Sequence, residues 1–219
     1  MTLAHLFWHR VAANAPALPF LPDTLYNALF PQKPGLGLTE LGEAAVRAMY
    51  RERMLIDVSH MRGDALDETF ELLNQLDRES GASPAEHPVI ASHSGYRFGK
   101  QKYLLDDDAV RRVAARGGVI GLILAQHQLN DGIRKHAETF EESLDVIARH
   151  LDRLRELTGS HEHAGIGSDF DGFIKPTMGG LERSSDLARL PAALEQRYGA
   201  ADAERILSGN VLRVLRTAL

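Results

Sequence analysis

Short apolar runs alternate with longer amphipathic stretches along most of the chain. Continuous apolar runs of this length are typical of strands buried on both faces of a parallel sheet. The runs lie at residues 54–59, 88–92, 118–124 and 163–168. The other stretches carry apolar residues at helical spacing and predict helices near residues 63–78, 106–115, 139–158, 185–197 and 200–218. Strands that alternate with helices in this way indicate parallel βαβ units.

The first forty residues follow a different pattern. Residues 1–8 form a short apolar run, and residues 14–37 are rich in proline. Proline at this density excludes a long helix and predicts an irregular loop of the kind that commonly shapes binding sites. Thr39 is suited to cap a helix that begins near residue 40.

Composition restricts the chemistry more than the fold. A chain of 219 residues with 44% hydrophobic residues suits a single domain, residues 1–219, with a substantial core. The net charge of -5, without basic runs interleaved with aromatics, argues against a nucleic-acid partner. The absence of cysteine leaves His, Asp and Glu as metal ligands, which favours zinc or another first-row divalent ion.

The distribution of apolar residues also bears on location. No apolar stretch reaches the ~18 residues needed to cross a bilayer. The N-terminus lacks the basic-then-apolar layout of a secretory signal. We therefore expect a cytoplasmic protein.

Two of the predicted strands end on a histidine that follows a serine. Residues 55–59 lead to His60, and residues 89–92 lead to His93. Adjacent parallel strands lie ~4.8 Å apart, so imidazoles at their carboxyl ends can converge on one ion. A single histidine at a strand end is more often structural, but two in successive strands favour a shared metal site. Asp57 lies in the first run and is placed to orient a ligand through a hydrogen bond.

A third run ends on an acid, Asp169. Gly165 and Gly167 weaken a strand, which implies that another group approaches the backbone closely there. Asp169 can act as a metal ligand, as a general base or as an acceptor for a substrate ammonium group. The competing interpretation is a turn with Asp171 and Gly172 at its corner, which explains Asp171 better than Asp169.

A cationic loop follows the second of these strands. Arg97, Lys100 and Lys102 offer partners to a substrate carboxylate, and a solvated loop is an equally good interpretation.

Other histidines give weaker signals. His5 closes a short apolar run and belongs to the same class as His60. His127 follows a predicted strand, whereas His161 and His163 lie near the end of a predicted helix, where we expect His161 at the surface.

These strings together resemble the membrane (renal) dipeptidase family, zinc-dependent peptidases of the amidohydrolase-like barrels. The matching phrases are LIDVSH, PVIASHS, ARGGVIGL, GIGSDFDG, GGLE and SGNVLRVL, and they span nearly the whole chain. The resemblance implies a (β/α)8 TIM-barrel fold, of which this chain holds strands four to eight. It also implies hydrolysis of dipeptides by a zinc-activated hydroxide.

The resemblance assigns roles to individual residues. The histidines that match His60 and His93 bind one zinc of a binuclear pair in the family. The aspartate that matches Asp169 acts at the reacting centre, and the histidine that matches His5 contacts the substrate. A family arginine holds the substrate carboxylate shortly after the second metal histidine.

The chain departs from the family at two places. Where the family has that arginine this chain reads KQKYLL, so that Arg97, Lys100 or Lys102 must take its role. The family holds its second zinc through a His-x-Asp pair and a bridging glutamate that lie upstream of the residue matching His5. We therefore expect an incomplete barrel, inactive or weakly active as it stands, completed by an N-terminal barrel segment or by another copy of the chain. The alternative is a non-catalytic barrel remnant that binds metal or a partner.

Overall fold

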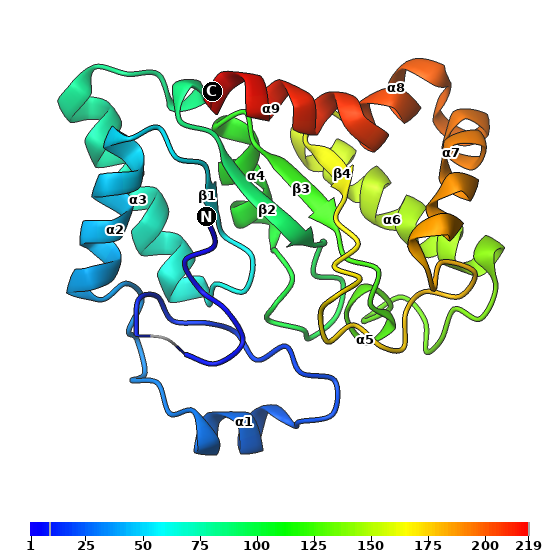
Figure 1. Cartoon of the computed structure of the whole chain (residues 1–219), viewed down its shortest axis with the longest axis horizontal. Coiled ribbons are helices and arrows are strands. Elements are labelled where there is room, and N and C mark those ends of the chain that lie inside the picture. The colour runs from blue at the N-terminus through cyan, green and yellow to red at the C-terminus, as the bar shows by residue number, and fades with distance from the viewer. Residues whose placement is uncertain (9, 219) are drawn as a thin grey trace.

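The computed structural model describes residues 1–8 and 10–218. Within these residues four parallel strands form one sheet in sequence order (Figure 1). They are β1 (Ile56–Asp57), β2 (Val89–Ser94), β3 (Val119–Leu122) and β4 (Ala164–Ile166). The register places Ile56 opposite Val89, Ile90 opposite Val119, and Ile120 opposite Ala164.

Amphipathic helices connect consecutive strands, as the sequence predicts. They are α3 (Gly63–Ser80), α4 (Asp107–Ala115) and α6 (Phe140–Thr158). The side chain of Asp106 caps α4 by accepting a hydrogen bond from the Ala109 amide at 3.1 Å. Thr139 caps α6 in the same way by accepting from the Glu142 amide at 3.2 Å. The parallel βαβ order is therefore confirmed.

The N-terminal part adds a strand-like segment and two helices. Thr2 forms an isolated parallel bridge to Asp57, so that the first residues extend the sheet beside β1. Thr39 caps α2 (Glu40–Arg51) by accepting from the Gly42 amide at 3.1 Å. The proline-rich loop also holds α1 (Asp23–Leu29), which forms in the proline-free stretch after Pro22. The sequence did not predict this helix.

The remaining helical segments are short. They are η1 (Pro84–Glu86), α5 (Gln126–Leu129), η2 (Ser184–Arg189), α7 (Leu190–Tyr198), α8 (Ala200–Glu204), η3 (Arg205–Gly209) and α9 (Asn210–Ala218). The helix predicted over residues 200–218 is thus interrupted by a π-helical turn. No helix in the described part of the chain is long and apolar enough to span a membrane.

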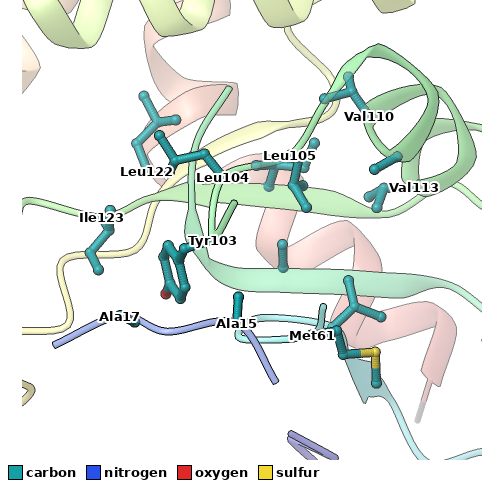
Figure 2. Close-up of a cluster of buried hydrophobic side chains, with 14 of the residues drawn as sticks. Ala15, Ala17, Met61, Tyr103, Leu104, Leu105, Val110, Val113, Leu122 and Ile123 are labelled. Atoms are coloured by element: carbon teal, nitrogen blue, oxygen red, sulfur yellow. The ribbon is translucent and has the colours of Figure 1, made fainter. Parts of the chain in front are cut away.

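One buried cluster joins the sheet to its helices and to the N-terminal loop. Figure 2 shows part of it, with Tyr103 and Ile123 near the loop segment that carries Ala15 and Ala17. In Figure 1 the arrowheads of β2 and β3 point toward this loop and α5, whereas α9 crosses the opposite end of the sheet. The predicted binding rim is therefore covered by the predicted loop.

Candidate functional site

A small cavity lies at the carboxyl ends of the strands. Its volume is about 30 Å³, room for roughly one water molecule. It is lined by His5, Leu6, Ala17, His60, Tyr103, Ile123, Gln128, Asp169, Gly172, Phe173 and Ile174. The rim is partly open, because His5 and Phe173 are exposed.

The two strand-end histidines meet beside this cavity. The Nε2 atoms of His60 and His93 are 3.0 Å apart. The ring of His5 lies 4.6 Å from that of His60, centroid to centroid. Burial and the neighbouring imidazoles of His93 and His5 lower the pKa of His60 from 6.5 to about 3. His60 is therefore neutral at physiological pH, which is the form that binds metal ions.

A hydrogen-bonded relay behind His93 fixes the orientation of its ring. The Ser92 hydroxyl donates to Asp57 Oδ2 at 2.6 Å and lies 2.7 Å from His93 Nδ1. Because the hydroxyl has one proton, His93 Nδ1–H is the donor to Ser92 Oγ, and Nε2 is the nitrogen that faces His60. The role predicted for Asp57 is thus exercised through Ser92.

Asp57 is suited to this position because it is charged although buried. Burial acts to raise its pKa, but hydrogen bonds from Ser92, Ser59 and Thr2 outweigh that effect and lower the pKa below its usual value. Its Oδ1 accepts from the Ser59 and Ser92 amides at 3.0 Å and 2.9 Å. A carboxylate held in this way anchors the ends of β1 and β2 together.

The backbone is strained at two of the predicted site residues. His60 has φ 65° and Asp169 has φ 55°, in the left-handed region that residues other than glycine rarely adopt. Each such residue costs on the order of 1–3 kcal/mol, and strain of this kind is concentrated at functional sites. Here it turns the chain at the strand ends where the cavity lies.

Asp169 heads a tight turn at the end of β4. The Gly172 amide donates to the Asp169 carbonyl at 2.8 Å, so the turn runs from Asp169 to Gly172. A Cβ on Gly172 would lie 2.2 Å from Asp169 Oδ2, so a larger residue there would displace the Asp169 carboxylate. Burial raises the pKa of Asp169, opposed by the nearby His93 and His5 imidazoles.

The close approach predicted at the glycines of this strand is found at Gly167. A Cβ there would lie 1.9 Å from the Ser92 carbonyl oxygen. At Gly165 the closest atom to a Cβ would be a Val119 methyl at 3.2 Å, a milder contact. Gly167 thus lets β4 approach the strand that carries His93.

The cations predicted to bind the substrate carboxylate lie away from the cavity. Arg97 donates to the Leu104 carbonyl at 2.9 Å and pairs with Asp106 at 3.3 Å. Lys100 and Lys102 are exposed, and none of the three cations lines the cavity. Their role toward a substrate carboxylate stays a prediction.

Two polar side chains of the cavity, Tyr103 and Gln128, were not among the predicted site residues. The Tyr103 hydroxyl donates to the His93 carbonyl at 2.6 Å, and its ring lies 4.9 Å from that of His60. Gln128 follows β3 on α5, beyond any motif. Neither residue type signals a site, and their positions depend on loop conformation.

Three further histidines that the sequence singled out, His127, His161 and His163, fall outside the site. The expectation that His161 lies at the surface is wrong, because it is buried and its Nδ1 contacts Asp202 Oδ2 at 3.0 Å. That contact joins the start of β4 to α8. His163 Nδ1 lies 2.9 Å from the Gly118 carbonyl, and His127 lines a separate cavity beneath the proline-rich loop.

The residues present fit part of a metal site. Two nitrogen ligands about 2.1 Å from one zinc ion at a tetrahedral angle lie about 3.4 Å apart, close to the 3.0 Å between His60 and His93 Nε2. No group of three or more His, Asp or Glu side chains in the described ranges is arranged to hold a metal ion. The chain thus offers two converging ligands and not a closed site.

Comparisons with known proteins place this site in context. A family model described as membrane dipeptidase, peptidase family M19, matches residues 23–219. A Klebsiella pneumoniae protein of the pqqA 5' region is 31% identical over 87% of this chain and 65% of its own length. Dipeptidase 3 of Rattus norvegicus is 32% identical over 82% of this chain and 33% of its own.

Solved structures agree with the fold. A metallopeptidase from Rhodobacter sphaeroides, bound to a phosphinate mimic of the dipeptide L-Ala-D-Ala, is 26% identical with a TM-score of 0.69, over 87% of this chain and 50% of its own. The probable dipeptidase PvdM from Pseudomonas aeruginosa has a TM-score of 0.70 over 99% of this chain. The TIM-barrel type predicted from the sequence is confirmed. The chain spans from about a third to two thirds of the length of these proteins.

Proposed function

The chain belongs to the membrane dipeptidase family, peptidase family M19, and from that premise we propose that its cavity is part of a metal-dependent dipeptidase site. The observation that carries the proposal is the convergence of His60 and His93 Nε2 at 3.0 Å beside a cavity that Asp169 also lines. The dipeptide mimic bound by the Rhodobacter sphaeroides metallopeptidase supports a dipeptide as the substrate.

His60 and His93 would hold the ion, which we propose to be zinc. A bound zinc ion supplies Lewis acidity, polarising a carbonyl and lowering the pKa of water. His60 would remain neutral during this, because its pKa is held at about 3, and Ser92 would hold the His93 ring in place. Asp57 would accept the hydrogen bond from the Ser92 hydroxyl, and this would keep Ser92 in place to orient the His93 ring.

Asp169 would move protons at the reacting centre. Because burial raises its pKa, it takes up a proton closer to neutral pH than an ordinary aspartate does. It would accept a proton from the attacking water and donate it to the leaving amine nitrogen. His5, whose exposed ring lies at the rim, would contact the substrate.

The free carboxylate of the substrate needs a cation at the rim. We propose Arg97 or Lys102, which both lie in the loop after β2. Lys102 is exposed and free to turn, whereas Arg97 would have to leave Asp106. A dipeptide also needs a larger cavity than 30 Å³, so the exposed Phe173 at the rim would have to move.

We further propose that these 219 residues alone turn over little or no dipeptide. Two histidines hold one ion weakly, and no cluster of three or more ligands in the described part of the chain supplies a second. Each lost transition-state contact costs on the order of 3–4 kcal/mol, so two lower turnover by roughly 10⁴-fold or more.

The test is hydrolysis of L-Ala-L-Ala and L-Ala-D-Ala with excess zinc. The chain alone should be inactive, and the chain joined to the preceding barrel segment of a family member should be active. In that longer protein Asp169→Asn should abolish turnover while zinc stays bound. Equal rates for the shorter and longer proteins would overturn the need for a second set of ligands.

A second candidate function rests on the same two-ligand geometry. A barrel remnant that binds metal or a partner without turnover would also show only His60 and His93 converging. Zinc binding with no hydrolysis by the longer protein would favour it.

A further inference from the structure

One wall of the cavity carries an unpaired buried amide. Gln128 is 2% exposed, and its Oε1 atom is buried with no hydrogen-bond partner among the described residues. The same side chain lines the cavity together with His60 and Asp169. None of the roles derived above uses it.

The backbone around Gln128 is hydrogen-bonded, so the unpaired side-chain amide does not reflect a flexible segment. The Gln128 and Leu129 amides donate to the Ala125 carbonyl at 3.2 Å and 2.9 Å. The Leu129 carbonyl lies 2.9 Å from His150 Nε2 on α6. The position of Gln128 is therefore fixed from both sides.

A neighbouring glutamine shows what a structural amide looks like on this same turn. Gln126 Nε2 donates to the Ala137 and Thr177 carbonyls at 2.9 Å and 2.8 Å. Its Oε1 accepts from the Ala137 amide at 3.1 Å. The amide nitrogen and oxygen of Gln126 thus both have hydrogen-bond partners inside the protein, whereas the Gln128 oxygen has none among the described residues.

An unpaired buried amide is unfavourable unless a ligand pairs with it. Leaving such a group without a partner destabilises the fold, and a partner that enters the site restores the lost hydrogen bond. The cavity wall also contains Leu6, Ala17, Ile123 and Ile174. Among the polar side chains that line the cavity, His5, His60 and Asp169 already have proposed roles, and the Tyr103 hydroxyl donates to the His93 carbonyl. The Gln128 amide is therefore the group left to recognise a hydrogen-bonding group on a neutral substrate side chain.

We infer that Gln128 selects dipeptides with a hydroxyl or carboxamide side chain over those with aliphatic side chains of the same shape. The inference rests on the proposed function. Rotation of the amide by 180° presents either its oxygen or its nitrogen, so that both donors and acceptors on Ser, Thr, Asn or Gln are served. A charged side chain would lose its water without gaining a counter-ion from Gln128.

The preference should be measurable as an affinity ratio. A pocket that hydrogen-bonds a substrate group rejects the analogue without it, since its own polar group is then left unpaired. For one neutral hydrogen bond we expect Thr dipeptides to bind about tenfold more tightly than Val dipeptides. Thr and Val have the same shape, so packing cancels in the comparison.

The experiment is calorimetric titration of the zinc-loaded chain with L-Ala-L-Thr, L-Ala-L-Val, L-Thr-L-Ala and L-Val-L-Ala. The wild-type chain should prefer Thr over Val in one of the two pairs, and Gln128→Leu should remove that preference. Gln75→Leu, an exposed glutamine on α3, serves as the matched control and should keep it. Equal binding of Thr and Val by the wild type would overturn the inference alone, whereas binding of none of the four would overturn the proposed function with it.

Thermal unfolding of the same variant gives a second, independent readout. Gln128→Leu replaces an unpaired amide with an apolar group of similar size and should raise the melting temperature. A structural glutamine would instead give a lower melting temperature when replaced. A lower value for Gln128→Leu would therefore overturn the inference even before any dipeptide is added.

Discussion

At the scale of single residues, Ser92 determines which nitrogen of His93 faces the cavity. Its hydroxyl proton is used by Asp57, so the proton on His93 Nδ1 points to Ser92 Oγ. A hydrogen bond of this kind orients the ring and makes it a better ligand. The same relay joins β1 and β2 behind the site.

Removing this hydroxyl should weaken metal binding without removing a ligand. For Ser92→Ala we expect zinc affinity to fall about 10–100-fold, because the His93 ring loses its orienting partner. Titration calorimetry with zinc measures the change. Ser94→Ala on the same strand, whose hydroxyl contacts the Tyr103 carbonyl, should bind zinc as the wild type does. Unchanged affinity in Ser92→Ala would show that the relay does not position His93.

The sequence predicts some of the residues at the site and misses others. His60, His93 and Asp169 each end an apolar run, and strand ends meet at one rim, so their proximity follows from the pattern. Tyr103 reaches the cavity from a loop and Gln128 from the short helix α5, and tertiary contacts that no periodicity records set the position of both segments.

At the scale of elements, glycines allow the strands to converge beneath the site. A Cβ on Gly121 of β3 would lie 2.3 Å from the Ser92 carbonyl oxygen, and one on Gly167 would lie 1.9 Å from the same atom. Such a separation is far inside van der Waals contact. Neither strand could take a side chain there without moving away from β2.

Gly167→Ala should therefore be strongly destabilising. We expect a loss of about 3 kcal/mol in the free energy of unfolding, since backbone must shift to admit the methyl group. Gly63→Ala is the matched control, because nothing lies within 4 Å of a Cβ there. Urea unfolding of both variants measures the difference, and equal stabilities would contradict the close approach.

The helices follow the sequence more closely than the strands do. Periodicity and the cap Thr39 locate α2, and periodicity alone locates α6, where the structure adds a local capping contact from Thr139. Three of the four strands, β1, β3 and β4, are shorter than predicted: β1 covers only Ile56–Asp57 of the run at 54–59. The left-handed turn at His60 ends that strand region, and an apolar run does not reveal such a turn.

At the scale of the whole molecule, a buried histidine ties three elements together. His150 on α6 accepts from the Tyr96 amide through Nδ1 at 3.0 Å, and its Nε2 lies 2.9 Å from the Leu129 carbonyl on α5. Burial lowers its pKa from 6.5 to about 4. The folded protein therefore holds this histidine neutral where the unfolded chain would protonate it.

This shift predicts a loss of stability in acid. Between pH 6.5 and about 4 the unfolded chain binds the extra proton, so stability falls as pH falls through this window. The contribution from His150 amounts to about 3 kcal/mol at the lower end. Urea unfolding at pH 7 and pH 4.5 should show a smaller drop in His150→Gln than in the wild type. The exposed His136→Gln variant should show the full drop, and the same drop in all three proteins would contradict the assignment.

The two proposed ligands come from different parts of the sheet, so the proposed metal site depends on the folded sheet and not on a local motif. His60 follows β1 and His93 lies on β2, and both Nε2 atoms face one point. We propose that these two residues bind the same ion. Neither can then hold it alone.

The most direct test is the zinc content of the purified chain after equilibration with zinc, measured by elemental analysis. His60→Ala and His93→Ala should each lose most of the zinc that the wild type retains, and His136→Ala should retain all of it. Wild-type zinc content in either His60→Ala or His93→Ala would contradict a shared site.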